Sequence, residues 1–117
     1  MSGEVFSSLK SYLREYLVKN VPGAIYFFNI LCTLTYRADC ISLLLESPSK
    51  LYSIVLSHYR GDVVAADYAF TLLFVNPIVN YLKKPDIARQ LLDYAKTGRD
   101  SDFVEVVKKF IVKGISS

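Results

Sequence analysis

The chain is dominated by one apolar stretch, residues 63–82, which reads VVAADYAFTLLFVNPIVNYL. Asp67 is its one charged side chain, so the stretch is too apolar for a surface helix. Proline lacks a backbone donor and interrupts helices, so Pro77 predicts a kink or a restart in which Asn76 caps the second half. The sequence therefore predicts a buried central helix against which the other segments pack.

Two further helices are predicted before this stretch. Ser2 and Glu4 open an amphipathic helix that ends near Asn20, because apolar side chains recur every three or four residues between them. Residues 23–36 are apolar nearly all round and carry no charge. We expect these residues to form a second buried helix.

Capping and helix-breaking residues divide the rest of the chain. Residues 23–46 form either one continuous helix or two, with Asp39 as the N-cap of the second. Ser47 and Asp62 are expected to cap the helices that follow them. Further boundaries are predicted at Pro48, Gly61, Pro85 and Gly98, and at Asp100 to Asp102, which cap the last helix.

No segment shows the alternation and turn pattern of paired strands. The sequence predicts one all-α domain over residues 1–117, a compact bundle of six to eight short helices. Residues 63–82 and 23–36 are expected inside it, with the first and last helices laid over them.

The composition predicts a partner. Apolar residues make up 52% of the chain and charged residues 21%, with a net charge of +3. A domain this small leaves roughly a third of its extended-chain surface exposed, so it cannot hide all of its apolar side chains. We expect some of them to meet a second copy of the chain in a homodimer, or another protein.

The cysteines and the N-terminus bear on the compartment. On one helix Cys32 and Cys40 would lie roughly 12 Å apart, too far for a disulfide. Two reduced thiols and the lack of a secretory pattern at the N-terminus predict a cytoplasmic protein. With a single Gln and a single Met, thermolabile side chains are scarce, which favours a thermophilic source.

The order of helix boundaries resembles that of small, all-helical archaeal domains. The resemblance covers roughly residues 40–112 and rests on Arg60-Gly61-Asp62, Asn76-Pro77, Lys84-Pro85-Asp86 and Gly98-Arg99-Asp100. It implies a stand-alone or output-type module that contacts another macromolecule. It implies no site residue.

Two polar residues are candidates for a pocket. Asp67 lies one turn into the most apolar helix, where it faces water, pairs with Arg37 or Arg60, or occupies an apolar ligand pocket. His58 is the one histidine, so any imidazole chemistry would depend on it. Its expected role is that of a polar residue at a helix end.

Catalytic chemistry is not predicted. The sequence has no glycine-rich phosphate loop, no nucleophile elbow and no carboxylate pair at a strand end. The spacings of Cys32, Cys40 and His58 match no zinc pattern. We therefore expect no catalytic residue, no metal and no cofactor.

Tyrosines are the first candidates for contact with a partner. The candidates are Tyr26, Tyr36, Tyr68 and Tyr81. They fall in segments with few charges, whereas readers of single-stranded nucleic acid interleave aromatic residues with many cations. Core or protein-interface positions are expected for them.

Lysines of the last third of the chain are the second candidates. The residues are Lys83, Lys84, Lys108, Lys109 and Lys113. On one side of the protein they would favour weak contact with nucleic-acid phosphates. Glu105, however, is spaced to pair with Lys109 within one helix.

Residues 63–82 also have the length of a membrane span. Asp67 at mid-helix would cost about 2.5–3.5 kcal/mol on insertion, so no span is expected. The sequence favours a non-enzymatic protein–protein interaction or oligomerisation module that acts through an apolar, tyrosine-rich helical face. A nucleic-acid-associated accessory protein and an apolar small-molecule binder are the alternatives.

Overall fold

Helices make up all the regular structure of the described chain. The computed structural model describes residues 5–116, and side chains over residues 5–114. The α-helices are α2 (Ser7–Asn20), α3 (Pro22–Tyr36), α4 (Cys40–Glu46), α5 (Pro48–His58), α6 (Val63–Phe70), α7 (Asn76–Leu82), α8 (Ala88–Lys96) and α9 (Asp100–Ser116). A π-helical turn, η1 (Thr71–Val75), joins α6 to α7, and a 3-10 turn, η2 (Pro85–Ile87), precedes α8. The predicted all-α bundle of six to eight helices is confirmed.

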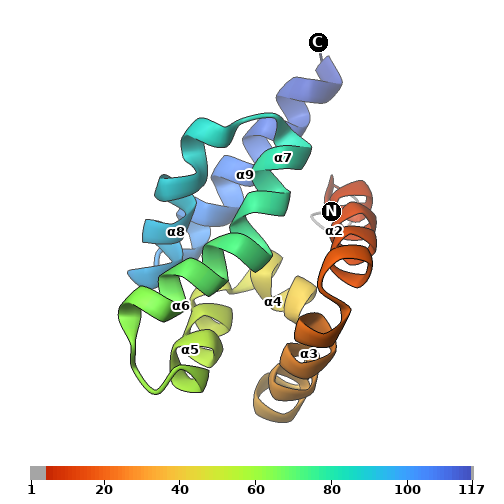
Figure 1. Ribbon diagram of the computed structural model, residues 1–117. Helices are drawn as coiled ribbons and strands as arrows, with labels where there is room; N and C mark the ends of the chain where they lie inside the picture. The colour runs from red at the N-terminus through yellow and green to blue at the C-terminus, as the bar shows by residue number, and fades with distance from the viewer. Residues whose placement is uncertain (1–4, 117) are drawn as a thin grey trace.

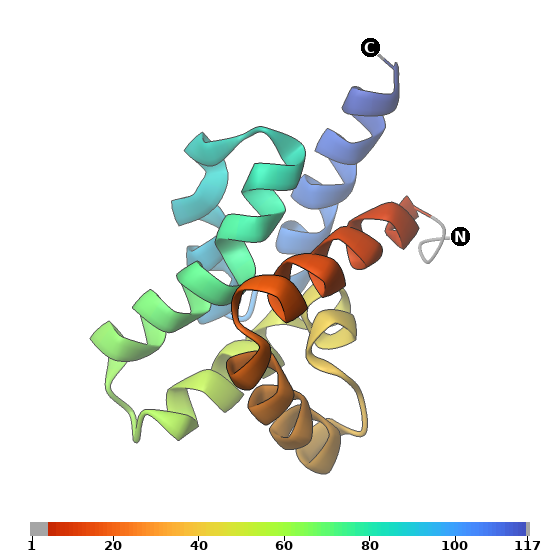
Figure 2. The same cartoon turned by 45° about the vertical axis from the view of Figure 1, so that its right-hand side comes forward.

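The helices form a body of 43 × 25 × 25 Å. The continuous α6–η1–α7 element packs against α5, α8 and α9, and α2 crosses α7 (Figures 1 and 2). α3 continues from the end of α2 and contacts α4 and α5. The C-terminal end of α9 projects beyond its neighbours in both views.

The predicted central helix passes through Pro77 without a break. The backbone widens into the π-helical turn η1, in which the amide of Asn76 bonds to the carbonyl of Thr71. This turn accommodates Pro77, whose ring would clash with the carbonyl of Leu73 in a regular α-helix. Asn76 has helical backbone angles and lies inside the helix, so the predicted cap at Asn76 is wrong.

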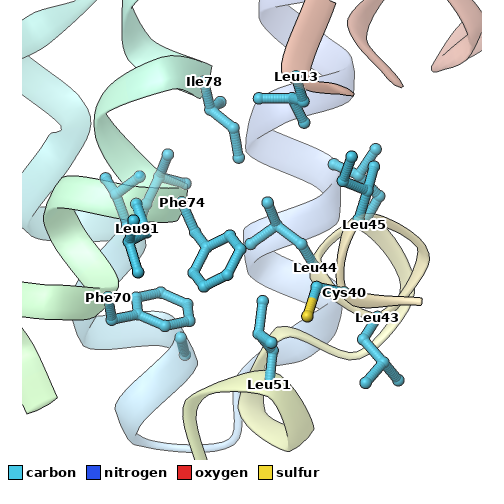
Figure 3. Packing of buried hydrophobic residues seen from close by; sticks show 14 of the residues in the cluster. Leu13, Cys40, Leu43, Leu44, Leu45, Leu51, Phe70, Phe74, Ile78 and Leu91 are labelled. Atoms are coloured by element: carbon cyan, nitrogen blue, oxygen red, sulfur yellow. The ribbon is translucent and has the colours of Figure 1, made fainter. Parts of the chain in front are cut away.

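One apolar core joins the helices. Phe70, Phe74 and Ile78 of the central element are at most 1% exposed. They meet Leu13 of α2, Leu44 of α4, Leu51 of α5 and Leu91 of α8 (Figure 3). The large buried side chains of the central helix therefore lie in its C-terminal two thirds.

One side of the central helix stays open to solvent over its N-terminal half. Val64, Tyr68 and Leu72 are 82%, 71% and 45% exposed. They recur every four residues, so they form a stripe along one side of α6 and η1. The prediction of a buried helix therefore holds for one face only at this end.

Residues 23–46 form two helices. α3 and α4 meet at an angle of 62°, and Arg37 between them has a left-handed backbone with φ of 57°. The side chain of Asn29 accepts a hydrogen bond from the amide of Cys40 at 2.9 Å, which fixes the bend. The possibility of one continuous helix is therefore ruled out.

The predicted N-caps meet different outcomes. Asp39 accepts a hydrogen bond from the amide of Ser42, and Asp62 accepts one from the amide of Ala65, so both caps are confirmed. Ser47 precedes α5 but its side chain makes no cap bond. The predicted opening at Ser2 and Glu4 lies outside the described residues.

By length and composition, one helix could cross a membrane, or two if the bent pair Pro22–Tyr36 and Cys40–Glu46 counts as one span. Residues Val63–Leu82 are long and apolar enough to cross a bilayer, and half of their most apolar window is buried inside the protein. The core helix of a soluble protein passes the same test. That the helix does not span a membrane stays a prediction.

Candidate functional site

The outer side of α3 exposes several large apolar side chains to solvent. Only Ile25, Phe28 and Cys32 of this helix are fully buried. Tyr26 and Leu34 are 73% and 77% exposed. The prediction that residues 23–36 form a buried helix is therefore wrong for half of its circumference.

We define the α3 face by the apolar side chains that are open to solvent here. They are Val18 of α2 and Tyr26, Phe27, Ile30 and Leu34 of α3. With roughly 150–250 Å² of surface per large side chain, their exposed fractions amount to on the order of 500 Å². A patch of this size reaches the upper part of the range for monomers, where such patches often serve binding.

The spacing of these residues suits a helix–helix contact. Tyr26, Ile30 and Leu34 are four residues apart, so they follow one ridge of the helix. Thr33 and Asn29 border this ridge and supply hydrogen-bonding groups. Residues 21–36 contain no charged side chain. Another helix could therefore pack on this ridge without burying a charged side chain of α3.

Two hollows flank the ridge and could receive side chains of a partner. One of about 450 Å³ lies between α2, α3 and α4, with Val18, Ile25 and Ile41 on its walls. Arg14 and Asp39 also line it and supply its charges. A shallower one of about 300 Å³ lies on α3 itself, between Tyr26 and Leu34.

His58 lies at the edge of the α3 face, beside Phe27. It is the last residue of α5, and its ring centroid is 4.9 Å from that of Phe27 and 5.4 Å from that of Phe28. The ring of Tyr59 is also 4.9 Å away. His58 and Phe27 line a third hollow, of about 380 Å³, between α3 and α5. His58 is thus a polar residue at a helix end that borders the α3 face.

The four tyrosines that the sequence singles out do not share one surface. Tyr26 belongs to the α3 face, and Tyr36 lies at the end of α3 with the Lys50 ammonium 5.2 Å from its ring centroid. Tyr68 is exposed on α6. Tyr81 is half-buried and packs on Tyr12, with 5.2 Å between the ring centroids. Tyr81 is therefore part of the packing between α2 and α7.

Asp67 is held by residues from two other helices. Its Oδ1 accepts a hydrogen bond from the Tyr52 hydroxyl at 2.5 Å, and its Oδ2 is 2.7 Å from the ammonium of Lys96. The predicted pairing with Arg37 or Arg60 is therefore wrong. The cation comes from α8, which packs against α5 and against the turn η1 that follows α6.

This cluster has an electrostatic consequence for Tyr52. Burial, followed by the hydrogen bond to Asp67 and the charge of Asp67, raises the pKa of Tyr52. None of the three hollows around α3 is lined by Asp67. Because both carboxylate oxygens have donors within the chain, the cluster reads as a structural link between α5, α6 and α8.

The lysine candidates are partly brought together. The ammonium groups of Lys84, Lys109 and Lys113 lie near the ring of Phe110. Lys83 is exposed at the left-handed end of α7, and Lys108 is half-buried on α9. Within the described chain, Lys109 forms no ion pair with Glu105, so the predicted pairing in α9 is wrong.

The two cysteines lie on different helices and meet inside the core. Cys32 and Cys40 are both 0% exposed and both are free thiols. The hydrogen bond with the Cys32 thiol, followed by burial, raises the pKa of Cys40. The separation expected along one helix does not apply because the chain bends between them. Over residues 5–114, no three His, Cys, Asp or Glu side chains gather as metal ligands.

Sequence reasoning missed most of the α3 face. It singled out Tyr26 but not Phe27, Ile30 or Leu34. The sequence contains one signal for this face. Residues 21–36 carry no charge, and the chain also contains a second, longer apolar helix. Only one helix can lie at the centre of a small bundle, so one of the two had to be partly exposed.

Neither protein-family models, nor curated proteins, nor solved structures give a match to the chain. The resemblance to small archaeal helical domains therefore stays a prediction from the sequence.

Proposed function

We propose that the protein is a non-enzymatic self-association module, in which the α3 faces of two copies pack against each other. The observation that carries the proposal is the exposure of Tyr26 and Leu34 on a helix without charges. Burying such side chains stabilises a complex by roughly 25 cal/mol per Å² of apolar surface. A partner that covers them is therefore favoured over water.

A second copy of the chain is the occupant that the chemistry favours. A two-fold interface brings the same patch of both copies together, so a charged patch would repel its own copy. Residues 21–36 carry no charge, and the charges of Arg14 and Asp39 in the hollow beside Val18 are opposite in sign, so the α3 face does not repel its own copy. If the two α3 helices cross in opposite directions, their dipoles also attract each other.

The size of the face predicts a weak dimer. Two α3 faces would together bury on the order of 1,000 Å², below the roughly 1,200–2,000 Å² of stable interfaces. Contacts from Asn29 and Thr33 at the edge would add to this area. We therefore expect dimers that dissociate on dilution into the micromolar range.

A charge placed in the face tests the proposal. In Leu34→Glu, a carboxylate replaces a side chain that is 77% exposed, so folding is spared while dimerisation buries an unpaired charge. Val64→Glu on α6 is the matched control, because Val64 is 82% exposed on a different helix. Sedimentation velocity over a dilution series compares both with the unmodified chain, and circular dichroism confirms that they fold.

The expected result is a monomeric Leu34→Glu variant and a Val64→Glu variant that dimerises like the unmodified chain. A Leu34→Glu variant that dimerises normally would refute the α3 face as the interface. Loss of the dimer in Val64→Glu alone would instead assign the interface to the stripe of Val64, Tyr68 and Leu72.

A further inference from the structure

Three lysine ammonium groups gather around one aromatic ring at the end of the molecule opposite α3. The Nζ atoms of Lys84, Lys109 and Lys113 are 5.0, 5.4 and 6.0 Å from the ring centroid of Phe110. Lys84 follows α7, whereas the other two come from α9. We call Lys84, Lys109, Lys113 and Phe110 the lysine cluster.

The charge of the lysine cluster is poorly neutralised by the chain. Within the described residues, only Lys84 has an acidic partner, Asp86, at 3.8 Å. Asp86 is 69% exposed, so water screens this pair strongly. Lys109 and Lys113 form no ion pair within the described chain. The three ammonium groups around the ring carry like charges that repel one another, and an external anion would relieve the repulsion.

The ring of Phe110 holds the ammonium groups in place. Its electron-rich faces attract cations, an interaction worth roughly 0.5–1 kcal/mol at exposed sites. Lys109 and Lys113 are also one helical turn apart, so their side chains leave α9 on one side. The cations are therefore partly ordered before any ligand arrives, which lowers the entropic cost of binding.

The position of the lysine cluster suits a long ligand. It lies where the connection after α7 meets α9, and α9 projects beyond its neighbours at this end (Figures 1 and 2). An extended polyanion could pass over a projecting helix end without meeting the rest of the protein. Lys83 directly precedes Lys84 in the sequence, and Lys108 directly precedes Lys109. Both add positive charge near the lysine cluster.

We infer that the lysine cluster binds the phosphodiester backbone of nucleic acid, without reading its sequence. Ammonium groups bind phosphate as point charges, and each phosphate neutralised releases counterions into solution. The cluster offers ammonium donors and no amide or carboxylate to discriminate base edges. Binding should therefore be weak, insensitive to sequence and strongly dependent on salt.

Nucleic acid is favoured over an anionic membrane by the placement of the charges. Electrostatic docking on lipid headgroups usually takes four to eight basic residues along a helix or a juxtamembrane segment. Here the lysines come from α9 and from the connection after α7, and three of their ammonium groups gather on one ring instead of lying along one helix. The inference does not depend on self-association through α3.

The test is a fluorescence anisotropy titration with a short fluorescein-labelled, single-stranded oligodeoxythymidine. The unmodified chain is compared with the triple variant Lys84→Gln, Lys109→Gln, Lys113→Gln at salt concentrations from about 50 to 200 mM. The matched control is the triple variant Lys10→Gln, Lys19→Gln, Lys50→Gln, which loses the same net charge elsewhere on the chain. A third variant changes the cluster lysines to arginine.

The inference predicts about a ten-fold weaker affinity at low salt for the cluster variant, and a log–log salt slope shallower by about two. The control and arginine variants should bind nearly as tightly as the unmodified chain. Equal weakening in both glutamine variants would show a net-charge effect and overturn the site, as would no binding by the unmodified chain. Tighter binding to vesicles of phosphatidylcholine and phosphatidylserine, lost in the cluster variant, would overturn it in favour of a membrane.

Discussion

The carboxylate of Asp100 accepts two hydrogen bonds from Ser49, one from the backbone amide and one from the hydroxyl, each 2.9 Å long. Ser49 lies in the first turn of α5, where Ser47 provides no side-chain cap. The sequence predicts Asp100 as a cap of its own helix, α9. It instead accepts hydrogen bonds from the first turn of α5, and so joins two helices that are distant in the sequence.

Removal of this carboxylate should loosen the contact between α5 and α9. We expect Asp100→Ala to lower the free energy of unfolding by about 1–2 kcal/mol, as for the loss of a helix cap. Asp102→Ala is the control, because Asp102 forms an exposed pair with Arg99 worth less than about 1 kcal/mol. Urea unfolding measures both, and equal losses would contradict a capping role for Asp100.

The Tyr52–Asp67 pair should make the protein sensitive to alkali. The pKa of Tyr52 is raised in the folded chain, so folding favours its protonated form. This contribution is complete below the unfolded pKa of about 10 and is lost as the pH rises above it. We therefore expect the melting temperature of the unmodified chain to fall more steeply above about pH 10 than that of Tyr52→Phe.

Other groups titrate in the same range, and the comparison must separate them. Cys40, whose pKa is also raised, is present in both proteins, so its effect cancels in the difference. Tyr26→Phe is the control because Tyr26 is 73% exposed. If Tyr52→Phe and the unmodified chain lose stability in parallel above pH 10, the pair with Asp67 does not contribute as described.

Two glycines should respond to alanine in opposite directions. Gly61 has a φ of 84° in the turn before α6, and an added Cβ meets no atom there, so any cost is conformational. Gly61→Ala should destabilise the protein by about 1 kcal/mol.

Gly23 lies inside the first turn of α3, where an added Cβ also meets no atom. Gly23→Ala should therefore stabilise the protein by about 0.5–1 kcal/mol. Thermal melts decide the signs, and a stabilised Gly61→Ala variant would contradict the left-handed turn.

Helix types and most boundaries could be predicted because they depend on local chemistry. Asp39 and Asp62 cap their helices as expected, since a cap needs only the next three residues. The structure around Pro77 is harder to predict from the sequence. Whether a proline ends a helix or is accommodated by a π-helical turn depends on the side chains that pack around it. Phe74 and Ile78 on either side of Pro77 are buried, and this packing favours a continuous helix.

The candidate site could be predicted only in part because it depends on tertiary packing. The lack of charge over residues 21–36 predicts burial, but it does not say whether the cover comes from the same chain or from a partner. Likewise, the partner of Asp67 is Lys96, which is far away in the sequence and reaches Asp67 only because α8 packs against α5 and η1. Three of the five candidate lysines meet around Phe110 for the same reason.

Self-association through the α3 face is the central claim, and the molar mass of the unmodified chain in solution tests it most directly. Multi-angle light scattering across a concentration series should give twice the 13.2 kDa mass of the chain at high concentration, falling towards one chain on dilution. A mass of one chain at every concentration, up to the highest at which the protein stays soluble, would contradict the claim.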